Sequence, residues 1–520
     1  MKTNIIKYAL SLLVLVMMAV GCTKDFDEIN TDPNRPKEVP TVNLISSAQK
    51  TLTDDIFDEW FSGRQGLLWA QYWSQRNYTE EDRFIIRQNT NNTYFRLIYT
   101  DLMDLQEIVN IASNPDKIAE INTYYGDAEG QVAVANICKA YIFQLLASTY
   151  GDVPYEEAFD AVNNPTPAYS SQKVIFLDLF SKLKTAADYL AGSETTVFTS
   201  GDLIYDGDPQ KWAKFANSLR LKLAIRLSKV TDGDLVAARE AAIADISPDE
   251  VMQSNDDNAD ITYIGDGQSN APMYDGFYTS RRNDMTPSAN FVDLLKGIND
   301  TLNNVQNPFE GLVDPRIDIW VPLNGDGEYR GMPYGLVNQH ASALRAYVAN
   351  IYNSEPVYLQ ADATVSWMDY AEVCFILSEL NGWDQTWYEE GVRASMEYWG
   401  VTEGIDEYIA QLPAANAETV ITQKYIALYM NGYEAWAEYR RTGYPESIIE
   451  VGELTGPLVN GEATTFGPAP ITGNDRIPRR LTYPVQEYTI NAASVEAAAE
   501  AIGGDTYNSR LIWDVPGGVK

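Results

Sequence analysis

The chain has 520 residues, of which 45% are hydrophobic, and its formal net charge at pH 7 is −35. This length and composition are sufficient for a large hydrophobic core, in one domain or several. The acidic balance argues against nucleic acid and anionic lipid surfaces as partners, because both repel a strongly negative protein. The single histidine, His340, argues against zinc sites built on several histidines and against Ser–His or Cys–His catalysis elsewhere in the chain.

The first residues are typical of an export signal. A basic start with Lys2 and Lys7 leads into an apolar run, which ends at Ala19-Val20-Gly21-Cys22. The run is too short to cross a membrane as a helix, and small residues directly before a cysteine suit a lipoprotein signal peptidase. The sequence therefore predicts a signal peptide over residues 1–21 and a lipid anchor, including palmitate, on Cys22. An ordinary signal peptide that happens to contain a cysteine is the alternative.

Residues 22–42 carry Thr, Asp, Asn and Pro without periodicity, and we interpret them as a lipidated tether. No second apolar stretch is read as a membrane span, so the mature chain is expected to be held to the bilayer by its acyl chains. Two further cysteines, Cys138 and Cys374, lie in apolar helical patterns. Free buried thiols are favoured over a single bridge between them.

From about residue 43 the hydrophobic pattern becomes helical. Apolar residues recur at three- and four-residue spacing on single helix faces. Three such stripes are Trp212, Phe215, Ala216, Leu219, Leu223 and Leu227; Val134, Cys138, Tyr141 and Leu145; and Trp367, Ala371, Cys374 and Leu377. Each stripe is interpreted as core rather than as a ligand site.

The predicted helices come in pairs with short connections. The expected pairs are 128–150 with 171–191, 209–230 with 234–246, 364–380 with 387–400, and 416–431 with the residues after Glu434. Such pairs indicate a mostly α fold with four tetratricopeptide-like units in a single domain over residues 43–520, although the regular 34-residue signature is absent. Long loops at 252–290, 303–340 and 455–482 separate the pairs and are candidates for function.

Several motifs, taken together and in order, resemble one known family, the SusD/RagB nutrient-binding outer-membrane lipoproteins. The resemblance covers essentially the whole mature chain, from Cys22 to Trp513-Asp514. It rests on Tyr150-Gly151-Asp152-Val153-Pro154-Tyr155, Tyr205-Asp206-Gly207-Asp208 before Trp212 to Arg220, Gly432-Tyr433-Glu434-Ala435-Trp436, Tyr439 to Pro445, and Ile477 to Pro484 followed by Glu487 and Asn491.

This resemblance implies a function as well as a fold. Members of the family sit on the outside of the outer membrane over a SusC-type TonB-dependent transporter. They bind oligosaccharides, or peptides in the RagB branch, and act as a hinged lid that delivers the cargo without performing chemistry on it. The physical interpretation of the motifs is structural, however: Trp436, Arg440 and Arg441 are expected to hold helix pairs together through guanidinium bonds to carbonyls, and are not nominated as ligand residues.

A glycan site needs exposed flat aromatic rings flanked by polar donors and acceptors, because sugars present apolar C–H faces and a rim of hydroxyls. Three segments have this mixture: Gln71 to Tyr78, Tyr274 to Asn283, and Trp320 to Tyr334. The alternative is that their aromatic residues pack loops onto helices. The ligand residues predicted from these segments are Tyr72, Trp73, Arg76, Tyr78, Tyr274, Phe277, Tyr278, Arg282 and Trp320.

No cofactor is expected, although two acidic loops need consideration. Asn255 to Asp260 and Asn324 to Glu328 offer closely spaced oxygen ligands, but neither has the twelve-residue pattern of a calcium loop with its terminal Glu. A solvated loop is favoured over bound calcium for both. Carboxylate pairs for glycoside hydrolysis cannot be identified among 73 acidic residues, since only their separation in space is diagnostic.

Two alternatives to a nutrient-binding lipoprotein remain from the sequence. One is a lipid-anchored hydrolase of glycans or peptides, which would show turnover and a carboxylate pair in a cleft. The other is a helical scaffold of an outer-membrane complex that binds no small ligand. An exposed aromatic platform would separate a binding protein from such a scaffold.

Overall fold

The structure is a computed structural model that describes residues 39–467 and 475–515. The predicted signal peptide, the lipidated Cys22 and most of the predicted tether lie outside the described residues. The first described helix, α3, begins at Thr41, close to the predicted end of the tether.

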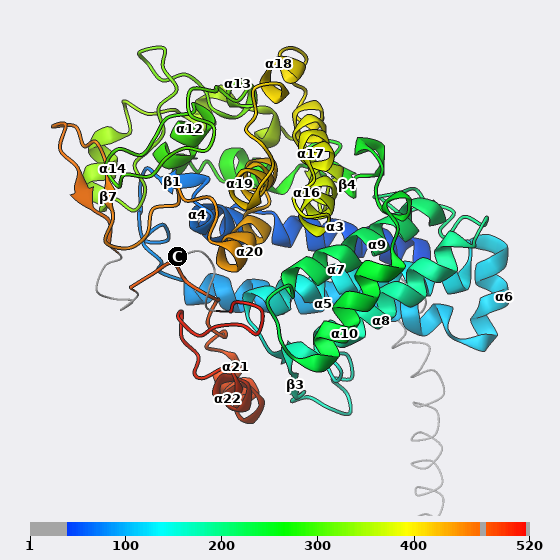
Figure 1. Ribbon diagram of the computed structural model, residues 1–520. Helices are drawn as coiled ribbons and strands as arrows, with labels where there is room; N and C mark the ends of the chain where they lie inside the picture. The colour runs from blue at the N-terminus through cyan, green and yellow to red at the C-terminus, as the bar shows by residue number, and fades with distance from the viewer. Residues whose placement is uncertain (1–38, 468–474, 516–520) are drawn as a thin grey trace, which may run out of the picture.

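The longest helices form one array, on the right of Figure 1. Successive helices pack against one another: α3 on α5, α5 on α7, α7 on α8, α8 on α9, and α10 on both α8 and α9. Their bounds are α3 Thr41–Ile56, α5 Gln88–Ala112, α6 Pro115–Tyr124, α7 Ala128–Thr149, α8 Gln172–Ala191, α9 Pro209–Arg226 and α10 Gly233–Asp245. This mostly helical architecture confirms the predicted fold class, and the predicted pairs α7–α8 and α9–α10 are both observed.

These helices begin where a short polar side chain can accept hydrogen bonds from the free amides of the first turn. Asp127 caps α7, Ser171 caps α8, Asp208 caps α9 and Asp232 caps α10. Pro209 then occupies the first position of α9, where its missing N–H costs nothing. Caps of this kind explain why the sequence pattern located the helix starts closely.

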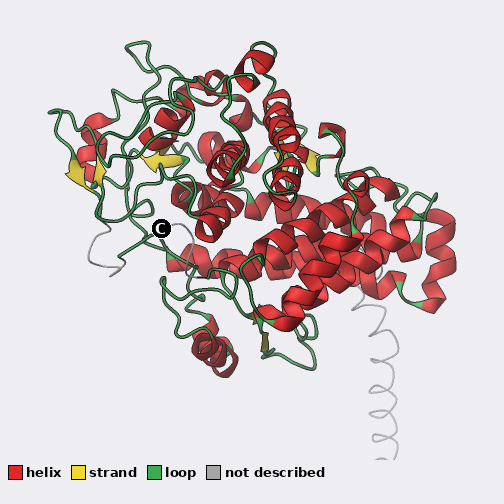
Figure 2. Ribbon diagram, in the orientation of Figure 1, coloured by secondary structure: helices red, strands yellow, loops and turns green. Residues whose placement is uncertain are grey.

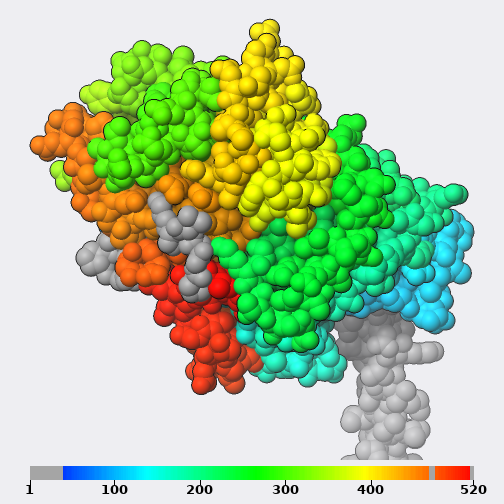
Figure 3. Space-filling model, in the orientation of Figure 1, coloured from blue at the N-terminus to red at the C-terminus, as the bar shows by residue number. Residues whose placement is uncertain are grey.

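A second helical group lies above the first in Figure 1, and both groups pack with the loops into one continuous body (Figures 2 and 3). α16 packs along α17, as predicted, and α19 packs on both. α20 instead packs mainly against the neighbouring π-helix η1, α4 and α7, so α19 and α20 differ from a simple helix pair. The bounds are η1 Glu59–Gly66, α4 Leu67–Trp69, α16 Tyr370–Leu380, α17 Gln385–Tyr398, α18 Ile405–Ile409, α19 Ala417–Ala427 and α20 Gly432–Thr442. The last two helices, α21 Glu487–Ile490 and α22 Ala492–Ala501, lie apart from this group at the bottom of Figure 1.

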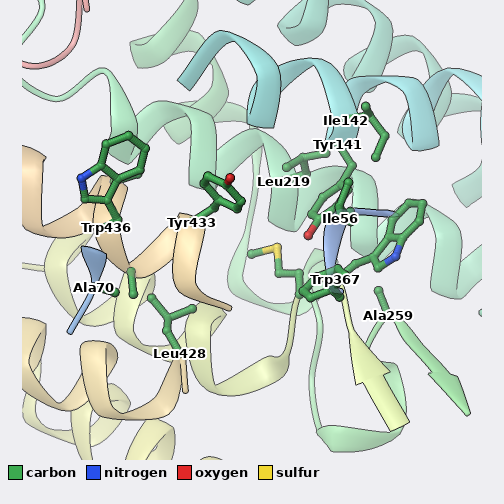
Figure 4. Close-up of a cluster of buried hydrophobic side chains, with 14 of the residues drawn as sticks. Ile56, Ala70, Tyr141, Ile142, Leu219, Ala259, Trp367, Leu428, Tyr433 and Trp436 are labelled. Carbon is green, nitrogen blue, oxygen red and sulfur yellow. The ribbon is translucent and has the colours of Figure 1, made fainter. Parts of the chain in front are cut away.

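The predicted helix at 364–380 starts later than expected. Thr364–Ser366 form strand β6, and α16 begins at Tyr370 after the cap Asp369. The β-branched Thr364 and Val365 suit the strand, which pairs with β4, Asp260–Thr262. Trp367 therefore precedes the helix, yet it is buried and its ring stacks on Tyr141 of α7 at 4.7 Å between centroids (Figure 4).

The described strands are short and form four two-stranded antiparallel ribbons. They connect loops rather than build a sheet layer. The ribbons are β1 Trp73–Gln75 with β5 Met285–Pro287, β2 Val153–Pro154 with β3 Tyr169–Ser170, β4 with β6, and β7 Leu454–Thr455 with β8 Thr464–Thr465. Short helices complete the loop-rich part: η2 Pro248–Glu250, η3 Asn255–Asp257, α11 Pro272–Tyr274, η4 Asp275–Thr279, α12 Ala289–Leu295, α13 Ile317–Trp320, α14 Asn338–Leu344, α15 Ile351–Ser354 and η5 Val357–Leu359.

Helix α7 lies at the centre of the core. It is the one helix among the described residues that is long and apolar enough to cross a membrane, but 83% of its most apolar window is buried inside the protein. Such burial is typical of a core helix. Cys138 on α7 and Cys374 on α16 are both buried and free, as predicted.

A close crossing fixes α20 against η1. A Cβ atom added to Gly432 would lie 2.3 Å from the backbone of Gly66, so neither helix could approach as it does with a larger residue there. Arg440 lies over the Trp436 ring, 3.5 Å from its centroid, and donates to the Ser148 carbonyl at 3.0 Å. The family motif around these residues is therefore structural, as the sequence indicated.

Eight charges, seven of them buried and one, Glu379, half-buried, join α9, α16, α19 and α20. Four are cationic and four are carboxylates, so the cluster is balanced: Lys222, Arg226, Lys424 and Arg441 with Glu372, Glu379, Glu434 and Glu438. Glu438 is central to the cluster, since Lys424 lies at 3.0 Å and Arg441 at 2.8 Å from its carboxylate oxygens. Burial alone would raise the pKa of Glu438, but the cations around it hold the pKa well below the usual value.

Replacing Glu438 with Gln should lower the free energy of unfolding by about 3–5 kcal/mol, because it leaves buried cations without their counter-charge. The matched control is Asp188→Asn, which breaks the exposed Lys184 pair on α8 and should cost less than about 1 kcal/mol. Chemical denaturation followed by circular dichroism measures both. Equal effects for the two variants would contradict this account of the core.

Carboxylates also gather between α3 and α5. Burial, and then the neighbouring charge of Asp101, raises the pKa of Asp55 to about 8. Burial likewise raises the pKa of Asp58 to about 7, although Tyr94 donates a hydrogen bond to its carboxylate. Both groups hold protons more tightly in the folded chain than in the unfolded chain, so they favour folding at low pH and this contribution is lost as the pH rises through these values.

We therefore expect the free energy of unfolding to fall between about pH 4 and about pH 8. The Asp55→Asn variant should show a shallower decline, because its amide does not titrate. Denaturant titrations at a series of pH values test both statements. A wild-type stability that rises over this range, or an unchanged slope in the variant, would be inconsistent with the raised pKa of Asp55.

Candidate functional site

Two of the three predicted ligand segments meet through the β1–β5 ribbon. Trp73 pairs with Pro287 and Gln75 with Met285, and the Arg76 amide donates to the Asp284 carbonyl at 2.5 Å. Residues 76–78 and 281–283 therefore leave the same end of the ribbon side by side. Sequence reasoning selected both segments but could not show that they are neighbours.

The most exposed aromatic residue there is Tyr78, whose side chain is 55% exposed. The Arg282 guanidinium lies 5.6 Å from the Tyr78 ring centroid and 5.6 Å from that of half-buried Trp60. Tyr78 and its neighbour Arg281 have positive φ angles of 55° and 53°. Backbone held in this region by residues other than glycine is found preferentially at functional sites.

Hydrogen bonds hold the polar groups around this ring. Arg76 donates to the Asn283 side chain at 2.8 Å and to the Arg345 carbonyl at 2.7 Å. Arg345 in turn donates to the Asn77 side chain at 2.8 Å. We call the set Trp60, Arg76, Asn77, Tyr78, Arg282, Asn283 and Arg345 the Tyr78 surface.

Two half-buried tyrosines of the second predicted segment, Tyr274 and Tyr278, form a row with Tyr352. The Tyr278 ring lies 5.1 Å from Tyr274 on one side and 5.1 Å from Tyr352 on the other, between centroids. Burial, followed by the charge of Glu355, raises the pKa of Tyr278 to about 12, so its hydroxyl stays protonated. Within the described part of the chain this hydroxyl has no hydrogen-bond partner.

Two π-helices support the Tyr78 surface from beneath, η1 with Trp60 and η4 with Tyr278, and they pack against each other. Such segments are uncommon and often lie at functional sites. Gly276 permits the contact, because a Cβ atom there would lie 2.3 Å from the Glu59 side chain. Buried Arg64 joins the layers by pairing with Glu59 at 2.6 Å and Asp284 at 2.7 Å.

The predictions for four aromatic residues are corrected. Tyr72, Trp73, Phe277 and Trp320 are each 0% exposed and offer no surface to a ligand. Tyr72 stacks on Tyr425 and Trp320 on Tyr429, both at 4.6 Å, because α19 and the residues after it cover this side of β1. Trp73 donates to the Tyr429 hydroxyl at 3.0 Å, and Phe277 packs edge-on against its ring.

The remaining predicted residues, Arg76, Tyr78, Tyr274, Tyr278 and Arg282, lie at or next to the Tyr78 surface. Arg76 is 6% exposed and forms its floor. Sequence reasoning missed Trp60 and Arg345. Trp60 lies in the π-helix η1, and Arg345 bonds to Asn77 across 268 residues of sequence, so no local pattern marks either one.

The acidic loops considered for calcium are engaged in other contacts. Asp257 pairs with Lys214 at 2.8 Å and accepts the Gln253 amide at 2.8 Å. The Asn324 side chain accepts amides of its own turn, from Asp326 and Glu328. Across residues 39–467 and 475–515, no group of three or more His, Cys, Asp or Glu residues is placed to hold a metal ion.

An apolar ring beside planar guanidinium and amide groups can stack on one face of a sugar and bond its hydroxyls. The carboxylates of Glu59 and Asp284 are tied to Arg64, and that of Glu80, two residues after Tyr78, pairs with Arg87. The groups on the Tyr78 surface can therefore recognise a ligand.

Comparison with known proteins places the chain in a family. Residues 33–484 match the SusD-like family described as starch-binding and associating with the outer membrane. This chain belongs to that SusD-like family. No curated protein matches it.

Solved structures share the fold. A SusD homologue from Parabacteroides distasonis superposes with a TM-score of 0.74 at 23% identity, covering 91% of this chain and 98% of that one. A chitin-binding SusD homologue from Flavobacterium johnsoniae gives a TM-score of 0.70 at 23% identity, covering 92% and 98%. A SusD homologue from Bacteroides uniformis also gives 0.70 at 23% identity, covering 92% and 100%. At these identities the likeness establishes the fold alone.

Trp73→Ala should lower the free energy of unfolding by about 3–5 kcal/mol, because it opens a cavity among Phe277, Tyr358 and Tyr429. Tyr78→Ala should change it by less than about 1 kcal/mol, since that ring is largely in solvent. Denaturant unfolding of the two variants tests the assignment of Trp73 to the core and Tyr78 to the surface. A stable Trp73→Ala protein would restore Trp73 as a candidate ligand residue.

Proposed function

We propose that the protein is a lipid-anchored, surface-exposed lipoprotein of the outer membrane that binds nutrient oligosaccharides on the Tyr78 surface. Family membership supports the class of ligand, since the family is described as starch-binding and outer-membrane associated. One structural relative is named a chitin-binding SusD homologue. The observation that carries the proposal is the exposed Tyr78 ring, flanked by Arg282 and by Asn77 and Asn283.

The arrangement fits a sugar better than a flat apolar ligand. Tyr78 offers a ring face for the C–H side of a pyranose, and the surrounding amides and guanidinium groups offer donors and acceptors for its hydroxyls. The hydrogen bonds through Arg76 and Arg345 fix these groups before a ligand arrives, which lowers the entropic cost of binding.

We further propose that the bound oligosaccharide is passed intact to a SusC-type TonB-dependent transporter, with this chain acting as its lid. Lipidation at Cys22 would tether the lid to the membrane, and the acyl chains would give a stable anchor without a spanning helix. In this role the protein binds its cargo and does not cleave it.

Replacing Tyr78 with Ala should weaken oligosaccharide binding at least about tenfold, or remove it, with little change in the melting temperature. The chain lacking residues 1–22 is titrated calorimetrically with maltohexaose and with chitohexaose, and the recovered sugar is sized. The matched control is Tyr124→Ala, which removes a 68% exposed tyrosine of α6 and should leave binding unchanged.

Three results would count against the proposal. Undiminished binding by Tyr78→Ala would move the site elsewhere on the molecule. Shortened sugar after the titration would identify a hydrolase. Failure of both hexasaccharides and of acidic oligosaccharides to bind would favour a scaffold that takes no glycan.

A further inference from the structure

We infer that the Tyr78 surface selects oligosaccharides that carry carboxylate groups, as uronic acids do. The inference rests on the proposed function and narrows its ligand. The chain has 73 acidic residues against 38 basic ones, yet arginines gather at this surface with few acids to neutralise them.

Two of these arginines lack an ion-pair partner among the described residues. Arg76 contacts an amide oxygen of Asn283 and the backbone carbonyl of Arg345, and Arg345 contacts the amide oxygen of Asn77. Both guanidinium groups are therefore held by neutral acceptors. Burial, and then the nearby charge of Arg345, lowers the pKa of Arg76, as expected for a cation whose neighbours do not compensate its charge.

The acids next to the surface are already engaged. Asp284 is shared between Arg64 at 2.7 Å and Arg282 at 2.6 Å, and Glu59 also pairs with Arg64. Glu80, two residues after Tyr78, and Glu81 both pair with Arg87. Arg76 and Arg345 thus leave an excess of positive charge at the exposed ring, to which exposed Arg281 adds.

The positions of the groups suit a carboxylated sugar. The Arg345 side chain is exposed and bonds Asn77, the residue before Tyr78, while Arg282 lies over the Tyr78 ring. A pyranose stacked on Tyr78 would have guanidinium groups near its rim. A planar guanidinium bonds a planar carboxylate through two parallel N–H donors, and such bonds are stronger than those to a neutral hydroxyl.

The test compares hexagalacturonate with its fully methyl-esterified form, which has the same size and linkage but no charge. Calorimetric titration of the chain lacking residues 1–22 should give at least tenfold tighter binding of the acid at about 50 mM salt. The difference in affinity between the acid and the methyl ester should narrow at about 500 mM salt, because salt screens the attraction between exposed charges. Chitohexaose and maltohexaose are titrated beside them.

Arg345→Gln should remove most of the preference for the acid while leaving the affinity for the methyl ester within about twofold. The charge-matched control is Arg393→Gln, which removes one positive charge from α17 and should leave the preference intact. Melting temperatures of both variants are compared with that of the wild type. Circular dichroism spectra then verify that each variant is folded.

Equal or tighter binding of the ester would overturn the inference and leave the proposed function standing. Binding of chitohexaose or maltohexaose with no binding of hexagalacturonate would also overturn the inference and leave the proposed function standing. If none of the four sugars binds, the proposed function itself fails. If Arg345→Gln keeps the preference for hexagalacturonate and Arg393→Gln loses it, the inference is overturned. The selectivity would then depend on α17 rather than on the Tyr78 surface.

Discussion

The fold depends on a balanced group of eight charges, seven of which are buried. Lys222 and Arg226 extend from α9, and their partners come from α16 and α20, which follow much later in the chain. α19 adds Lys424, which pairs with Glu438. Burying a charge costs several kcal/mol of desolvation free energy, which only a paired counter-charge offsets. These helices can therefore pack stably only in the arrangement that pairs all the charges. The first helical array and the later one are joined at this point, and the loops extend from the joined scaffold.

The Tyr78 surface is placed by rigid elements rather than by the loops alone. The β1–β5 ribbon aligns its two segments, the η1 and η4 π-helices support it, and Arg64 ties both to Asp284. Trp73 and Phe277 anchor the ribbon and η4 in the core directly beneath the exposed Tyr78. Trp73 and Phe277, which the sequence predicted as ligand residues, therefore lie one layer below the Tyr78 surface and fix the position of its residues.

Much of the helical fold could be predicted from the sequence, because periodic apolar stripes and Asp or Ser caps are local signals. The predicted 128–150 and 171–191 correspond closely to α7 and α8. Burial of Tyr72 and Trp73 could not be predicted, because it is caused by Tyr425 and Tyr429, more than 350 residues away in sequence. Arg345 was missed for the same reason, whereas the order of the motifs identified the family.

The most direct measurement for the account is a crystal structure of the protein with a bound hexasaccharide that calorimetry has identified as a ligand. The account predicts a sugar ring within about 4.5 Å of the Tyr78 ring face, with an arginine of the Tyr78 surface on its polar groups. A hexasaccharide bound elsewhere, such as the groove between α12 and the β7–β8 ribbon lined by Asp293 and Pro457, would contradict it.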